Sequence, residues 1–423
     1  MKRKGKTYFL RIEVVPMHKP LKAQAEFVPH HKTLMILGII FVAINLRPAI
    51  TAAGPLIGTI QVDLQISSSA AGLLTTLPLL AFAFLSPLAP SLGHKQGNER
   101  IILAGLLVLF VGIVLRSFGL VPGLFLGTAL IGAGIAVCNV LLPALIKQNY
   151  PAQVGLLTGL YSTTMAASAG LAAGLSAPLA FQFNLGWSYS LLVWGACALA
   201  ALFIWLPQVN LRPTSQAQKV EAVSNPALWR SGLAWLVTFY MGSQSLLFYC
   251  IITWLPEILV SKGMTISTAG WMLAYMQFVG LPATFIAPVL ANRFKHQKWL
   301  ASSTGVLVLV GIAGLWLDAS LKLVLLWMLL IAIGSGAALS LALTLIGLRS
   351  QNPQQASHLS GMAQSVGYLF AAIGPVLLGA LYDLTQSWTP AILFLMATAM
   401  IISLTGLGAG RNQYVLQHEK QAS

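Results

Sequence analysis

Charged residues, and acidic residues above all, are scarce in this sequence. Only 8% of its 423 residues are charged, and nine are Asp or Glu. Soluble domains carry about 25% charged residues, so this composition excludes a soluble globular protein. No apolar stretch holds His and Glu at metal-binding spacing, which argues against an intramembrane metalloenzyme. We expect no catalytic residue, no metal and no cofactor.

Cysteine is equally rare. Cys138, Cys197 and Cys250 all lie within apolar stretches, where a buried thiol behaves as a small hydrophobic side chain. They predict neither a disulfide framework nor a metal site.

Apolar residues, by contrast, make up 57% of the chain. About 20 of them in a row can cross a bilayer as a helix, and twelve stretches qualify. These are residues 34–60, 69–91, 101–118, 122–146, 155–180, 188–206, 231–259, 268–291, 299–317, 321–346, 359–382 and 389–409. They predict an all-α membrane protein of twelve transmembrane helices in two six-helix bundles, residues 33–206 and 230–410. Residues 207–229 are then a cytoplasmic linker, and residues 1–32 and 411–423 cytoplasmic tails, the first one basic, disordered and without a signal-peptide core.

Basic residues are concentrated in every second loop. If both termini are cytoplasmic, twenty Lys and Arg residues lie inside and only Arg116, Lys262 and Lys322 lie outside. Cytoplasmic loops of membrane proteins carry such an excess. The net charge of +15 therefore indicates membrane orientation rather than nucleic-acid binding, and it predicts cytoplasmic termini.

The two halves resemble each other at an offset of about 200 residues. Residues 71–95 match residues 269–293, and Gly132-Ala133-Gly134 matches Gly334-Ser335-Gly336. Both halves have six spans and hence the same orientation. Such parallel repeats are typical of secondary transporters.

One cation stands inside an apolar stretch. Arg47 lies thirteen residues into the run 34–60, near the bilayer midplane if the run is one helix rising about 1.5 Å per residue. A guanidinium at that depth costs about 2.5 to 3.5 kcal/mol, and no acid lies at matching depth in another span. We therefore expect Arg47 to find its partner in a ligand. The alternatives are an interface position or a buried acid.

The twelve spans, the central linker and the basic loop after the second span resemble the major facilitator superfamily over residues 32–411. The loop signature of that superfamily is G-x-x-x-D-R-x-G-R-R. In the matching residues 90–100, Lys95, Gly97 and Arg100 fit. His94 replaces the acidic residue, so the salt bridge that the signature implies is not carried over.

Four segments are similar to the cyanate and 2-nitroimidazole transporter family within that superfamily. They are Asn45-Leu46-Arg47-Pro48, residues 72–83, residues 138–143 and residues 359–368. The resemblance implies alternating-access transport of a small, flat, anionic or weakly acidic solute across a bacterial cytoplasmic membrane. We expect a monomer in the lipid bilayer. The alternative is a broad-specificity drug exporter of the same superfamily.

The resemblance also implies a central cavity between the two halves. We expect Arg47 to bind the electron-rich end of the solute through a charge-assisted hydrogen bond. Amide and ring side chains of the cavity-lining spans are candidates for orienting the solute: Asn45, Asn139, Tyr161, Gln244, Trp254, Tyr275, Gln277 and Gln364, with Tyr240, Tyr249 and Tyr368 as further rings. A buried amide that bridges two helices is the alternative for each amide.

Energy coupling has few candidates. Proton-coupled carriers keep a titratable group deep in a span, but Asp63, Glu257, Asp318 and Asp383 all lie at or near span ends. Glu257 is the best candidate for a gating or coupling acid, and its alternative is a solvated helix end. A weakly acidic solute would need no such residue, because it carries the proton itself.

Overall fold

The computed structural model describes residues 29–150, 153–210, 226–317 and 320–416. All regular structure in these ranges is helical. The predicted tails and linker fall largely outside the described residues. The first helix begins at Pro29, ahead of the predicted boundary at residue 33.

Twelve helical spans in the described part of the chain confirm the predicted number. The first half consists of α1 (Pro29–Asn45), α2 (Pro48–Thr51), η1 (Gly54–Leu56), α3 (Ile57–Leu64), α4 (Ser68–Leu85), α5 (Ala89–Gln96), α6 (Asn98–Arg116), α7 (Val121–Asn149), α8 (Val154–Phe181), α9 (Gly186–Trp205) and η3 (Leu206–Asn210). The second half consists of α10 (Pro226–Arg230), α11 (Gly232–Ser261), α12 (Ile266–Arg293), α13 (Lys298–Leu317), α14 (Leu321–Leu348), α15 (Pro353–Thr385) and α16 (Thr389–Ala409). The short α5 begins inside the predicted second span, which therefore ends earlier, at Leu85.

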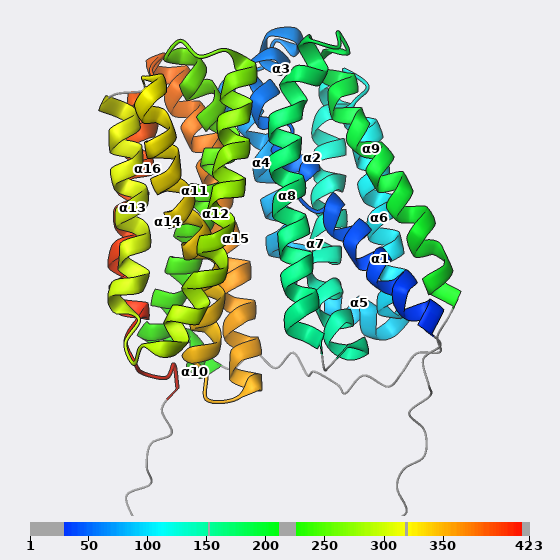
Figure 1. The fold of residues 1–423 in the computed structure, drawn as a ribbon, viewed down its shortest axis with the longest axis vertical. Helices are drawn as coiled ribbons and strands as arrows, with labels where there is room; N and C mark the ends of the chain where they lie inside the picture. Colours follow the sequence, from blue (N-terminus) through cyan, green and yellow to red (C-terminus); the bar gives the residue numbers. More distant parts are fainter. Residues whose placement is uncertain (1–28, 151–152, 211–225, 318–319, 417–423) are drawn as a thin grey trace, which may run out of the picture.

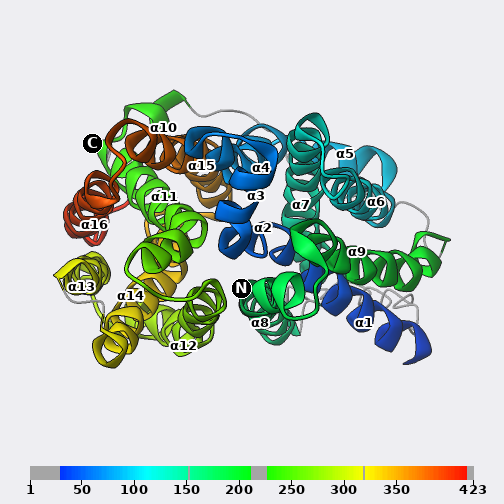
Figure 2. The same ribbon diagram turned by 90° about the horizontal axis from the view of Figure 1, so that it is seen from above.

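The halves form two bundles that stand side by side (Figures 1 and 2). In one bundle α6 packs on α7 and α9, and in the other α13 packs on α14 and α16. The bundles meet along two pairs of helices, α4 with α15 and α8 with α12. This arrangement is the predicted pseudo-symmetric pair of bundles. We call the end near α3 the distal end (top of Figure 1), opposite α5 and α10.

The contacts of the glycines correct the register of the predicted repeat. Gly134 packs on the α6 backbone at Gly105, and Gly334 packs on the equivalent α13 backbone at Thr304. Gly132 instead faces α4, so it is not the counterpart of Gly334. Both helices carry two small residues two positions apart, and residue identity alone does not tell which neighbour each one faces.

The first span is not the single helix that its apolar run predicted. Helix α1 ends at Asn45 and α2 begins at Pro48, with Arg47 at φ −123° and ψ −37° between them. A residue before proline is pushed out of the helical region, and Pro48 has no N–H for the helical ladder. Gly54 and Pro55 accompany a second interruption, at η1. Arg47 therefore lies in a turn, midway along the span Thr33–Leu64.

Candidate functional site

The Arg47 guanidinium lies at the interface between the two bundles. Its Cζ atom is 4.9 Å from the centroid of the Phe248 ring on α11, which is a cation–π distance. The Arg47 side chain is partly exposed, and no carboxylate of the described residues pairs with it. Its N–H groups thus remain available to a ligand.

Three tyrosines lie within electrostatic range of this guanidinium. They are Tyr161 on α8, Tyr249 on α11 and Tyr368 on α15. Both Tyr161 and Tyr249 are buried. The Tyr368 ring packs edge to face on Phe82 of α4, with centroids 5.5 Å apart. Aromatic faces and hydroxyls from both bundles therefore frame one cation.

An amide from α7 completes this group. The Tyr161 hydroxyl donates a hydrogen bond to Asn139 Oδ1 at 3.0 Å. We name Arg47, Asn139, Tyr161, Phe248, Tyr249 and Tyr368 the Arg47 cluster. A planar guanidinium is suited to a carboxylate-like or other electron-rich group, and the rings are suited to a flat solute. Phe248 is not among the predicted site residues: a cation–π contact needs only an aromatic face, and residue type alone does not show which phenylalanine supplies it.

Three other candidates use their polar groups elsewhere. Asn45 donates to the carbonyl of Phe41 at 2.7 Å and to that of Cys197 at 3.1 Å, tying α1 to α9. Gln244 is buried and bonds within its own helix. The Trp254 indole donates to the Pro375 carbonyl at 2.8 Å and is fully buried. None of these hydrogen bonds leads to Arg47.

The remaining candidates lie on helices of the bundle interface. Gln277 on α12 packs beside Gly170 of α8, and Tyr275, also on α12, is partly buried. Gln364 on α15 is partly exposed and donates to Ser360 Oγ at 2.8 Å. No hydrogen bond among the described residues joins these three side chains to Arg47.

Two carboxylates of the second bundle hold the first bundle at the distal end. Glu257 Oε1 accepts the Gly58 N–H at 2.9 Å. The two oxygens of Asp383 accept the N–H groups of Ser68 and Ser69 at 2.9 and 2.8 Å. Each carboxylate sits at the N-terminus of a helix, where free N–H groups and the helix dipole favour negative charge. We call these contacts the distal latch. Glu257 is thus an inter-bundle contact rather than a solvated helix end.

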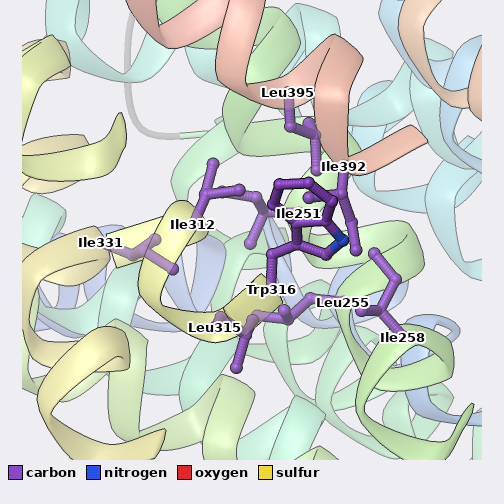
Figure 3. Close-up of a pocket in the computed structure, with 9 residues that line it drawn as sticks. All are labelled: Ile251, Leu255, Ile258, Ile312, Leu315, Trp316, Ile331, Ile392 and Leu395. Atoms are coloured by element: carbon purple, nitrogen blue, oxygen red, sulfur yellow. The ribbon is translucent and has the colours of Figure 1, made fainter. Parts of the chain in front are cut away.

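A separate pocket lies inside the second bundle (Figure 3). Side chains of α11, α13, α14 and α16 form it: Ile251, Leu255, Ile258, Ile312, Leu315, Trp316, Ile331, Ile392 and Leu395. No charged group lines this pocket. It is unsuited to an anion, so we place the candidate site at the Arg47 cluster.

Two pseudo-symmetric six-helix bundles are an architecture found in many transporters. The profile of the Major Facilitator Superfamily matches residues 36–375, and the chain belongs to this superfamily. It is 52% identical to an uncharacterized transporter, YycB, of Bacillus subtilis (strain 168), with 93% of this chain and 98% of that protein covered.

Two further relatives confirm the predicted family resemblance. The 2-nitroimidazole transporter of Escherichia coli (strain K12) is 40% identical, with 91% of this chain and 97% of that protein covered. The cyanate transport protein CynX of Escherichia coli (strain K12) is 30% identical, with 84% of this chain and 91% of that protein covered.

Proposed function

We propose that this transporter moves a small, flat, anionic or weakly acidic solute, cyanate-like or nitroimidazole-like, across a bacterial cytoplasmic membrane by alternating access. The proposal rests on Arg47, a cation that lies at the bundle interface and has no carboxylate partner among the described residues. The transport of 2-nitroimidazole and cyanate by two relatives supports the solute class.

In this proposal the Arg47 N–H fork binds the electron-rich end of the solute. The solute plane lies against the ring of Phe248, and Tyr161, oriented by Asn139, donates or accepts a further hydrogen bond. Arg47 belongs to the first bundle and Phe248 to the second, so a bound solute contacts both. That shared contact links occupancy to the movement of one bundle against the other.

The other predicted solute contacts differ in whether a present hydrogen bond must break before the side chain can reach the solute. Gln364 and Tyr275 would reach the solute from α15 and α12, and Gln277 from the α8–α12 contact. Asn45, Gln244 and Trp254 would each have to give up a present hydrogen bond. We propose Glu257 as a gating acid, because alternating access requires the distal latch to open. One chain contains both bundles, so a monomer is sufficient.

Counterflow in proteoliposomes tests the proposed solute class. Purified protein should exchange labelled 2-nitroimidazole or cyanate against an internal excess of the same compound, and the rate should saturate. A panel of unrelated amphiphilic drugs should compete poorly. Equal competition by the whole panel would favour the broad drug exporter, and absence of saturation would favour a channel.

Glu257→Gln is expected to open the distal end more often. Removing the charge weakens the hydrogen bond to Gly58 by about 1 kcal/mol, which corresponds to about fivefold more open molecules. Thr75 is buried and accepts a hydrogen bond from Thr253 of the second bundle. Labelling of Thr75→Cys by a membrane-impermeant maleimide should therefore become faster in Glu257→Gln. Asp63→Asn is the control, because Asp63 bonds Trp187 within one bundle. Equal labelling rates in Glu257→Gln and the parent protein would contradict a gating role.

A further inference from the structure

Arg116 is a second cation buried inside the first bundle. Arg116, which the sequence analysis above counts among the three outside charges, is the last residue of α6, and only 1% of it is exposed. Its Nη1 donates a hydrogen bond to the Ala49 carbonyl, and its Nε and Nη2 have no hydrogen-bond partner among the described residues. Burying a guanidinium with so little compensation is costly.

The Ala49 carbonyl belongs to the break in the first span. The backbone N–H groups of residues 50–53 donate to the carbonyls of Arg47, Pro48 and Ile50, passing over Ala49. No backbone N–H of the described residues reaches this carbonyl. A carbonyl in an apolar interior needs a donor, and Arg116 supplies it.

We propose that Arg116 is a positioning residue for Arg47. Ala49 is two residues beyond Arg47, so a hydrogen bond to its carbonyl holds the backbone just after Pro48 and thereby limits the directions that the Arg47 side chain can take. Thr51 fastens the other side of the break, since its hydroxyl donates to the Ala169 carbonyl of α8 at 3.1 Å. The consequence for solute binding rests on the proposed role of Arg47, whereas the consequence for the backbone does not.

Hydrogen–deuterium exchange of the full-length protein without solute tests the backbone part. Arg116→Met removes the donor, and we expect the amides of residues 50–53 to exchange about tenfold faster, as for a lost buried hydrogen bond. Arg349→Met is the matched control: Arg349 is also 1% exposed, but it bonds Gln297 and the Ala409 carbonyl in the second bundle. This control should leave residues 50–53 unchanged.

Arg116→Lys keeps a long side chain with a donor and should restore most of the protection. Where Arg116→Met does not fold, Arg116→Gln replaces it, because its shorter side chain is expected not to reach Ala49. Equal acceleration at residues 50–53 in the variants of Arg116 and Arg349, or none in the former, would overturn the proposal.

Solute binding separates this proposal from the function on which it builds. We expect Arg116→Met to raise the dissociation constant for 2-nitroimidazole about tenfold, with turnover at saturating solute little changed. Faster exchange at residues 50–53 with an unchanged dissociation constant would support the positioning contact and overturn the role of Arg47 in binding. Unchanged exchange, together with loss of transport in variants of Arg47, would overturn the proposal that Arg116 positions Arg47. It would still support Arg47 as the residue that binds the solute.

Discussion

Replacing Arg47 by alanine is expected to weaken solute binding about 100-fold and to abolish counterflow. A hydrogen bond to a charged group contributes about 1.5 to 3 kcal/mol, and a 100-fold loss corresponds to about 2.7 kcal/mol, so losing the guanidinium fork should cost at least this much. Arg47→Lys keeps the charge but loses the planar fork, so we expect a loss of about tenfold. Binding assays and counterflow with 2-nitroimidazole and cyanate measure both effects.

The fold should tolerate the alanine variant. The Arg47 side chain donates no hydrogen bond to another described residue, so its removal leaves no buried partner unsatisfied. We expect the melting temperature in detergent to remain the same or to rise, because an intramembrane cation is costly. Arg293→Ala, which removes an exposed arginine at the end of α12, is the control for net charge. Undiminished counterflow in both Arg47 variants would remove this residue from the mechanism.

The spans and the unusual arginine could be predicted because both depend on local sequence. A run of about 20 apolar residues is sufficient to indicate a membrane helix. A charge within such a run is exceptional whatever it contacts. The unusual position of Arg47 can therefore be recognised without knowing its neighbours, and Pro48 beside it indicates a break in the helix.

The partners of the other polar side chains could not be predicted, because they come from distant parts of the chain. Asn45 bonds a carbonyl 152 residues away, and the carbonyl that accepts from Trp254 is 121 residues away. Every residue presents a carbonyl, so no residue type marks the acceptor. The burial of Arg116 could not be predicted for a related reason. It is the last residue of its helix, and residues far away in the sequence pack against it, among them Ala49 of α2 and Gly127 of α7.

The largest conformational effect is expected from a single methyl group where α15 crosses α4. A Cβ atom on Gly379 would overlap the backbone carbonyl of Ser68, and backbone cannot move aside as a flexible side chain can. Ser68 also donates its N–H to Asp383 of the distal latch. Gly379→Ala should therefore separate the distal ends, expose Thr75→Cys to an impermeant maleimide and reduce counterflow at least about tenfold, as for a population shift above 1.4 kcal/mol.

Gly361→Ala is the matched control, since Gly361 lies on the same helix and has no atom within 4 Å of the added Cβ. Both substitutions replace glycine within α15, and both therefore gain about 1 kcal/mol of helix propensity. Any difference in labelling or transport between the two variants therefore comes from the contact between α15 and α4. If the two variants label and transport alike, close contact at Gly379 is not needed for distal closure. If Gly379→Ala labels faster but still transports at the parental rate, closure of the distal end does not limit transport, and the gating role of the latch fails with it.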